Sequence, residues 1–294
     1  MEATAPTRSD RQRRRVSELI ASASIELSPR DELAGNGLRD LFPPGTTVFV
    51  SHPASAGYDD VVAACARLRR AEFVPLPHIA ARRLASVQDA VDFLHRVTDE
   101  AEVSEALLIG GDPHWPAGPF RDTLTFLASG VAECHGIERV RFAGYPEGHP
   151  HITEQALDRA LIAKLALARE RGLAASLVTQ FGFEAAPIER WIGGLRLRGI
   201  DCPVAIGVAG PASVLTLAKF AVRCGIGSSL RALARGHSAF ARIVTEATPN
   251  ALIDALVSGE PEDNATIDRI HVFTFGGVRR TAAWVRSAPG ADAI

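Results

Sequence analysis

The chain has 294 residues, of which 47% are hydrophobic, so it is long enough to bury a large core in one or two domains. Its formal net charge of −2 gives no electrostatic basis for binding nucleic acid, and no apolar run reaches the roughly 18 residues of a membrane span. The four cysteines, at positions 65, 134, 202 and 224, form no metal-binding or redox spacing, so we expect a reducing, cytoplasmic location without disulfides or a metal site.

The first 21 residues are expected to form a solvated arm or helix ahead of the main domain. The stretch RSDRQRRRVSELI is rich in arginine, but Glu2 and Asp10 are unlike a transit peptide, and no apolar core of a signal peptide follows. A run of like charges is usually a solvated face. We therefore assign residues 22–294 to a single domain.

From residue 22 onward, short apolar runs alternate with amphipathic stretches. Most runs are apolar on both faces, which is typical of strands in a parallel sheet that is covered on both sides. The eight runs are SASIELSP, TTVFVSHP, EFVPLPHI, EALLIGGD, RVRFAGYP, AASLVTQF, PVAIGVAG and RIHVFTFGG. Eight strand–helix units in about 270 residues predict an α/β fold, the (β/α)8 TIM barrel. A doubly wound open sheet is the alternative, but no GxGxxG motif follows the first run.

Helical patterns separate the runs, with YDDVVAACARLRRA, SVQDAVDFLHRV, PFRDTLTFLASGV and SVLTLAKFAVRCG as clear examples. Thr153 and Ser213 are predicted N-caps, and Gly172 and Gly225 are predicted C-caps. Residues 228–259 carry two further helical patterns, SSLRALARGHSAFARIV and TPNALIDALVSG. We therefore predict extra helices before the eighth strand.

Polar side chains recur where the predicted strands end, and that end of the barrel carries the active site in this architecture. The residues at these ends are Ser51, His52, His78, Asp112, Thr179, Gln180, Arg279 and Arg280. Loops are polar in any protein, so one such residue alone means little. Glu26 differs, because it interrupts an apolar run inside the first strand, where an unpaired carboxylate is costly. We infer that Glu26 acts in acid catalysis and expect desolvation to raise its pKa.

The stretch GYPEGHP, residues 144–150, lies between the fifth strand and a long predicted helix. It places a phenol, a carboxylate and an imidazole, those of Tyr145, Glu147 and His149, in one short loop. A proline-stiffened turn is the structural alternative. The three side chains raise the question of which ligand the loop could hold, and the helix that begins near Thr153 offers free backbone N–H groups to an anion.

Six segments in chain order resemble the methylenetetrahydrofolate reductase family. IELSPR is similar to the first strand of that family, which carries its catalytic glutamate, and AGYPEGHP is similar to its AxYPExHP segment. PLPHI, IGGDP, LVTQFGFE and IGVAGPASVLTLAKFA are similar to further family segments in the same order. The resemblance covers nearly the whole chain. It implies a (β/α)8 flavoprotein that reduces 5,10-methylenetetrahydrofolate to 5-methyltetrahydrofolate with NADH or NADPH, and it also implies a homo-oligomer.

The resemblance implies roles for particular residues. Glu26 is expected to be the general acid, and Asp112 is expected to lie near the flavin and the pterin, where its charge favours a cationic intermediate. FAD is expected to contact Ser51, His78, Ile109, Gly110, Gly111, Asp112, Ala143, Tyr145, His149, Asp158 and Lys164. The folate substrate is expected to contact Glu26, Asp112, Gln180 and Arg279.

The chain departs from the family at several positions. Gly110 stands where the family often has arginine, and Gly182 replaces an aromatic residue. Lys164 matches the phosphate-binding lysine of the family only approximately, and the segment after Gly227 is unlike the usual family sequence. Two alternative functions stay open: a tetrahydrofolate-dependent demethylating or methyl-transferring barrel, and a non-catalytic partner subunit of the same fold.

Overall fold

The computed structural model describes residues 7–224, 226, 246–260 and 267–288. Its strands are β1 (Ser24–Leu27), β2 (Thr47–Val50), β3 (Val74–Ala80), β4 (Glu105–Ile109), β5 (Arg139–Gly144), β6 (Ala174–Gly182), β7 (Val204–Ala209), β8 (Ala212–Ser213), β9 (Glu246–Ala247) and β10 (Arg269–Phe273). Its helices are α1 (Arg8–Ala21), α2 (Asn36–Arg39), α3 (Tyr58–Arg70), α4 (Val87–Ala101), α5 (Thr123–Ala128), α6 (Val131–Cys134), α7 (Glu154–Glu170), α8 (Ala185–Leu197), α9 (Val214–Cys224), α12 (Asn250–Gly259) and α13 (Val278–Ser287). A 3₁₀ turn, Ala81–Arg83, directly follows β3.

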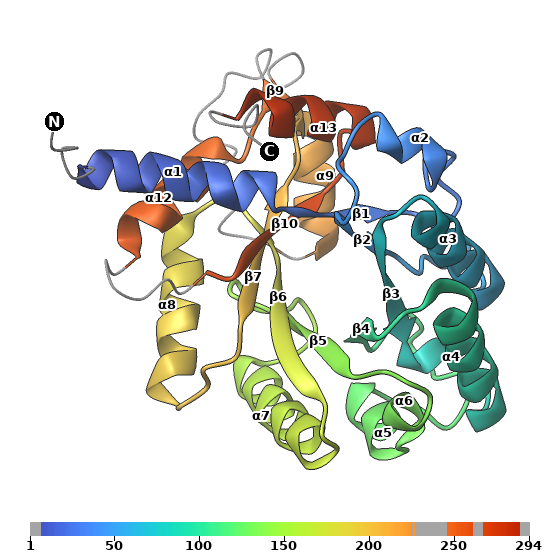
Figure 1. Ribbon diagram of the computed structural model, residues 1–294. Coiled ribbons are helices and arrows are strands. Elements are labelled where there is room, and N and C mark those ends of the chain that lie inside the picture. Colours follow the sequence, from blue (N-terminus) through green and yellow to red (C-terminus); the bar gives the residue numbers. More distant parts are fainter. Residues whose placement is uncertain (1–6, 225, 227–245, 261–266, 289–294) are drawn as a thin grey trace, which may run out of the picture.

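Eight parallel strands close into a barrel in the order β1-β10-β7-β6-β5-β4-β3-β2. The predicted (β/α)8 barrel is therefore confirmed, and the alternative of an open sheet is wrong. Each of the eight apolar runs contains one barrel strand. The barrel closes where β1 pairs with β10, Ser24 opposite His271 and Ile25 opposite Val272. Figure 1 shows the strands at the centre of the molecule and the helices around them.

The alternation of side chains along each strand divides the apolar residues between two cores. Ile25 and Leu27 of β1 belong to the large core between the strands and the surrounding helices. Ser24 and Glu26 alternate with them and therefore face the barrel interior. The interior is filled by a small apolar cluster of Phe49, Leu76, Leu107, Val178 and Ala205. Glu26 thus lies next to the apolar cluster that fills the barrel interior.

The predicted helix caps are confirmed where the structure describes them, but the pattern PFRDTLTFLASGV forms only the short helix α5, and α6 begins separately after Gly130. The Thr153 hydroxyl caps the N-terminus of α7, and the Ser213 hydroxyl accepts a hydrogen bond from the first turn of α9. Gly172 follows α7 with a φ of 73°, a left-handed conformation that favours glycine. The pattern TPNALIDALVSG forms α12. Gly225 and the helix predicted over 228–244 lie outside the described residues.

Helix α1 packs against α12 and α13 on the outside of the barrel, as Figure 1 shows for α12. Leu19 and Ile20 at its end are buried. Arg15 of α1 donates a hydrogen bond to the carbonyl oxygen of Ile267 at 2.6 Å and lies 3.5 Å from the Glu260 carboxylate. These contacts hold the first helix to the segment that leads into β10.

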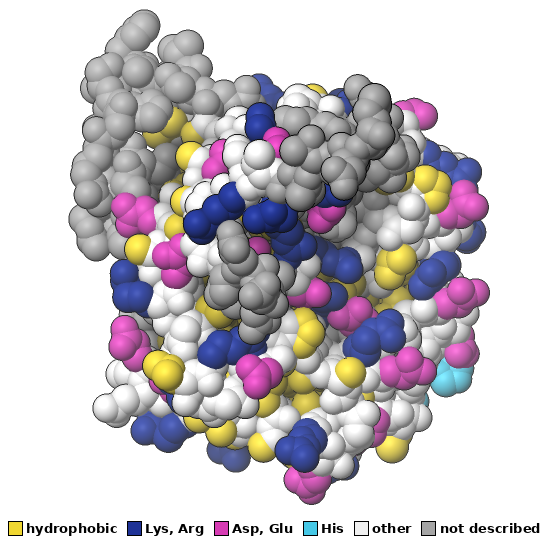
Figure 2. Space-filling model, turned by 60° about the vertical axis from the view of Figure 1, so that its left-hand side comes forward, with side chains coloured by type: hydrophobic (Ala, Val, Ile, Leu, Met, Phe, Trp, Pro, Cys, Tyr) yellow, Lys and Arg dark blue, Asp and Glu magenta, His cyan; other side chains and the backbone are white. Residues whose placement is uncertain are grey.

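Within the described part of the chain, no helix combines the length and the apolar character needed to cross a bilayer. Figure 2 shows acidic and basic side chains intermixed over the face that it displays. Such mixing gives that face no extended field of one sign.

Candidate active site

Glu26 lies in the barrel between two histidines from other strands. Its Oε2 atom is 3.5 Å from Nε2 of His78, at the end of β3, and 3.8 Å from Nε2 of His271, in β10. Both imidazoles are buried, whereas the Glu26 side chain remains 22% exposed. The carboxylate therefore reaches solvent at the barrel mouth while imidazoles flank it below the surface. We call Glu26, His78 and His271 the acid cluster.

The orientation of His271 is fixed by its neighbours. Its Nδ1 atom lies 3.0 Å from the hydroxyl oxygen of Ser24, so its other ring nitrogen faces Glu26. The Phe49 ring packs against it at a centroid distance of 4.1 Å and meets His78 edge-on at 6.0 Å. Among the described residues, Nε2 of His78 has no hydrogen-bond partner. One buried polar atom in the cluster is thus left unsatisfied.

Opposing effects set the pKa of Glu26. Burial raises the pKa of Glu26. The contact with His271, which at 3.8 Å is longer than a hydrogen bond, lowers the pKa, and so do the charges of both histidines when they are protonated. Together these lowering effects outweigh the effect of burial. The net result is a pKa below the ordinary value, so the expectation of a raised pKa is wrong for the ligand-free protein. That expectation took no account of the imidazoles. Burial also lowers the pKa of His78 and of His271, against the attraction of Glu26. Near neutral pH this favours an ionised carboxylate between neutral rings.

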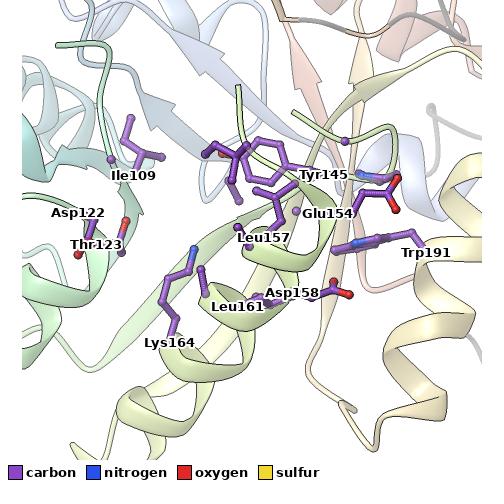
Figure 3. Close-up of a pocket in the computed structure, with 18 of the residues that line it drawn as sticks. Ile109, Asp122, Thr123, Tyr145, Glu154, Leu157, Asp158, Leu161, Lys164 and Trp191 are labelled. Atoms are coloured by element: carbon purple, nitrogen blue, oxygen red, sulfur yellow. The ribbon is translucent and has the colours of Figure 1, made fainter. Parts of the chain in front are cut away.

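A cavity of about 440 Å³ opens at the carboxyl ends of β4 and β5, between α5, α7 and α8. Sites for small molecules commonly span roughly 300–1,000 Å³. Figure 3 shows Lys164 and Leu157 reaching into it from α7 and Trp191 reaching in from α8. Its charged lining consists of Arg82, Asp122, Glu154, Asp158, Lys164, Arg190 and Arg198. The cavity therefore combines apolar walls with groups of both signs.

The structure separates the predicted cofactor contacts into two groups. The first group lines the cavity and consists of Ile109, Gly110, Ala143, Tyr145, Asp158 and Lys164. The second lies outside the described lining and consists of Ser51, His78, Gly111, Asp112 and His149. His78 belongs to the acid cluster instead. Ser51 donates its hydroxyl to the Leu27 carbonyl at 3.0 Å, and Asp112 is exposed in the β4–α5 loop.

Lys164 and Asp158, one and a half turns apart on α7, differ in their partners. Asp158 is held at 2.6 Å by Arg198, which directly follows α8, so a ligand hydroxyl has to compete with that ion pair. Lys164 is half-buried over the Phe142 ring, and among the described residues its ammonium makes no hydrogen bond or ion pair. Burial lowers its pKa, although Asp122 acts in the other direction. A partly desolvated cation without a partner fits a cavity that takes an anionic group.

The residues at the cavity therefore fit FAD in chemical terms. A Cβ added at Gly110 would meet no atom within 4 Å, so the backbone there is open to a ligand. Lys164 supplies a positive charge suited to a pyrophosphate, and the Thr123 and Asp122 side chains lie across the cavity from α7, as Figure 3 shows. The lining also offers apolar surface on Ile109 and Leu157.

Gln180 holds the 144–150 loop to the end of β6. A bulge between Val178 and Phe181 interrupts the regular pairing of β6 with β7, and Gln180 lies within this bulge. With its amide oriented to satisfy both partners, Gln180 donates to the Gly148 carbonyl and accepts from the Glu147 N–H, each at 3.2 Å. The side chain predicted to contact folate is thus engaged by the loop in the ligand-free protein. Arg279, the other predicted substrate contact, is exposed in the first turn of α13.

Aromatic rings from β6, α9 and β10 gather beside the acid cluster. They belong to Phe181, Phe183, Phe220, Phe273 and Phe275. Phe220 and Phe275 stack at 4.0 Å with an interplanar angle of 15°, and Phe273 meets the His271 ring at 4.8 Å. The hydroxyl of Thr274, between the two β10-end rings, donates to the Glu26 carbonyl at 2.7 Å. Planar apolar surface therefore adjoins His271 of the acid cluster.

Several of these residues escaped the sequence analysis. Ser24 and His271 meet only because the barrel closes, although the alternation in RIHVF already pairs His271 with Phe273 on one face. Trp191 belongs to no sequence motif that would have indicated a role in the cavity. Its indole lies so close to Gly144 that an added Cβ there would be 2.4 Å away, and this contact needs the register of α8 against β5.

A comparison of the sequence with models of known protein families finds no match. The fold and the site define a (β/α)8 barrel with an acid cluster at its mouth and a mixed-charge cavity at one side. Such barrels support many unrelated chemistries, so the function has to be argued from the site.

Proposed function

We propose that the protein reduces 5,10-methylenetetrahydrofolate to 5-methyltetrahydrofolate, with FAD bound in the cavity and NADH or NADPH as the source of hydride. One observation carries the proposal: the Glu26 carboxylate stands at the barrel mouth between His78 and His271, with solvent access on one side. The resemblance of six ordered sequence segments to the reductase family supports the choice of substrate.

The reaction needs a proton donor at the position of Glu26. The five-membered ring of the substrate opens to an iminium cation before hydride can reach the methylene carbon, and a proton delivered to N10 promotes this opening. General acid catalysis of this kind contributes roughly 10²–10⁴-fold. FAD, held in the cavity by Lys164 and its neighbours, would supply the redox chemistry that carries hydride from the nicotinamide to the folate.

Because its pKa is lowered, Glu26 is ionised near neutral pH and has no proton to donate. On the proposed function, it therefore has to take up a proton when the substrate binds. Folate bound over the mouth removes water from the exposed 22% of the side chain, and desolvation raises the pKa of a carboxyl group. His271, held by Ser24 through Nδ1, keeps its other nitrogen toward Glu26. We therefore expect net proton uptake when folate binds near neutral pH.

The other groups have binding roles in this proposal. Lys164 holds a phosphate of the cofactor. The stacked rings of Phe220 and Phe275 provide a flat surface for the pterin or the nicotinamide. For Gln180 to contact folate, it has to exchange its hydrogen bonds to the 144–150 loop for bonds to the ligand.

An anaerobic two-step assay tests the proposal. Protein reconstituted with FAD and passed through gel filtration should stay yellow, NADH or NADPH should bleach it, and methylenetetrahydrofolate should restore the colour with formation of methyltetrahydrofolate. Retained flavin without reoxidation by this folate would contradict the proposed substrate. Transfer of a methyl group to tetrahydrofolate would favour the demethylating alternative, and the absence of any turnover would favour a partner subunit.

A further inference from the structure

Two consecutive arginines in the turn after β3 reach the loops on either side of that strand. The guanidinium of Arg83 serves the loop after β2. It donates to the carbonyl oxygens of His52 at 3.0 Å, Ala54 at 3.3 Å and Ala56 at 2.9 Å, and also to that of Pro53. Four carbonyls of an irregular loop, which have no sheet or helix to bond with, thus converge on one side chain.

Arg82 does the same for the loop that joins β4 to α5, residues 110–122. Its Nε donates to the carbonyl of Arg121 at 2.8 Å, and Nη1 lies 3.5 Å from that of Pro113. Its backbone N–H donates to the Gly110 carbonyl at 2.9 Å, and its own carbonyl accepts from the Ala117 N–H at 2.8 Å. One residue therefore contacts the loop at its start, its middle and its end.

Backbone packing shows the same attachment independently. A Cβ added at Gly118 would lie 2.4 Å from the carbonyl oxygen of Ala85 and 2.5 Å from that of Leu84. Only glycine fits there, because the loop backbone rests directly on the chain just after the arginines. The β4–α5 loop is thus held both by hydrogen bonds and by close contact.

Arg82 also links this loop to the cavity. It is part of the lining, together with Gly110 at one end of the loop and Asp122 at the other. In the described part of the chain, neither Arg82 nor Arg83 comes within ion-pair distance of a carboxylate. Their charge is therefore directed at loop carbonyls, and each charged hydrogen bond is stronger than a neutral one.

We propose that Arg82 is a positioning residue that fixes the β4–α5 loop as one wall of the cofactor cavity, while Arg83 fixes the loop after β2. The effect on the cofactor rests on the proposed function, but the attachment of each loop does not. Lysine at either position presents one point of donation instead of a planar fork, so it replaces the arginine only in part.

Hydrogen–deuterium exchange on the full chain tests the attachment without any ligand. Arg82→Ala should raise amide exchange across residues 110–121, and Arg83→Ala should raise it across 52–57, each without affecting the other loop. Arg96→Ala, which removes an ion pair with Asp59 of α3 and another with Glu100 within α4, should change neither. Unchanged exchange in both loops, or an equal rise throughout the chain, would overturn the proposal.

Titration with FAD then tests the functional part. Arg82→Ala should weaken FAD binding about tenfold, Arg82→Lys should weaken it less, and Arg96→Ala should leave it unchanged. Saturating FAD should restore protection of residues 110–121 in Arg82→Ala. A loosened loop with full FAD affinity would overturn the positioning role. If the parent chain binds no FAD, the proposed function fails, and the exchange pattern alone decides whether the arginines hold the loops.

Discussion

The acid cluster and the cavity differ in how their charged groups are satisfied. In the cluster, Glu26 lies within 4 Å of two buried imidazoles from other strands. In the cavity, the ammonium of Lys164 is half-buried and, among the described residues, makes no hydrogen bond or ion pair. The charged group of the cluster therefore has close neighbours within the protein, whereas on the proposed function that of the cavity is left to a ligand. The proposal thus assigns the chemistry and the recognition of the cofactor to different strands of one barrel.

The largest effect is expected when the cluster loses its proton donor. Glu26→Gln keeps the shape of the side chain but cannot act as a general acid. Reoxidation of reduced flavin by methylenetetrahydrofolate should slow by roughly 10²-fold or more, while reduction of the flavin by the nicotinamide should change little. Stopped-flow absorbance at the flavin band measures the two half-reactions separately.

Glu138→Gln is a matched control for this substitution. Glu138 precedes β5, is 72% exposed and pairs with Arg139, far along the strand from the mouth. Its replacement should alter neither half-reaction. Equal slowing of both half-reactions in Glu26→Gln would instead indicate a displaced flavin, and an unchanged folate half-reaction would remove Glu26 from the mechanism.

The next largest effect is expected from the buried histidine His52, on which the carboxylate of Asp60 has only a small effect. Burial, and then the charge of Arg83, lower the pKa of His52 to about 4 from an ordinary 6.5. The unfolded chain therefore binds the proton more readily, so stability is full above pH 6.5 and falls as the pH drops. Between pH 7 and pH 5 the loss from His52 should be about 2 kcal/mol.

Urea unfolding at several pH values measures this loss. His52→Asn removes the titrating ring, so the variant should lose about 2 kcal/mol less than the parent protein over the same interval. Parallel curves for the two proteins would show that His52 is not buried as a neutral ring. The comparison then sharpens what Glu26 does for His78 and His271, because the charge of Asp60 raises the pKa of His52 only weakly.

A smaller effect is expected at the cavity. Lys164→Met removes a charge that makes no hydrogen bond or ion pair among the described residues but keeps an unbranched side chain over the Phe142 ring. FAD binding should weaken about tenfold, riboflavin binding should not change, and the melting temperature of the ligand-free protein should not fall. Lys219→Met, on the exposed face of α9, is the matched control and should leave both affinities unaltered. Equal weakening of riboflavin binding would place Lys164 away from the phosphates.

The smallest effect on the fold is expected at His149. Its Nδ1 accepts the His151 N–H at 3.2 Å, and its ring meets Tyr145 edge-on at 5.4 Å, so no large core contact is lost on truncation. His149→Ala should lower the melting temperature of the FAD-free protein only slightly while weakening FAD retention. A large drop in that temperature would support a structural role for the loop, and full FAD retention would agree with the position of His149 outside the cavity lining.

The fold was predictable because its signal is local and repeated. Each run of the kind TTVFVSHP is short, apolar on both faces and followed by a helical pattern, and eight of these units already define a barrel. The position of Glu26 within the first strand was predictable for the same reason, since a carboxylate within an apolar run is visible in the sequence alone. The caps at Thr153 and Ser213 likewise depend only on their neighbours.

The rest of the site depends on contacts between distant segments. Ser24 and His271 are 247 residues apart, and their meeting depends on which strands close the barrel and in which register. The pKa of Glu26 is lowered by His271 and His78, which the sequence does not place beside it. The predicted direction of the shift was therefore wrong. Arg82 was overlooked because its role depends on the path of a loop 30 residues further along, which no local pattern specifies.

The pairing of β1 with β10 also bears on how the chain matures. Domains generally begin to fold from their N-terminal side during synthesis, and here β1 emerges early with one edge open until β10 arrives. His271 comes on that last strand, so Glu26 has only one of its imidazole neighbours until the ribosome has nearly completed the chain. A chain truncated before β10 therefore lacks both the closed barrel and the finished acid cluster, so on the proposed function an incomplete product has no activity.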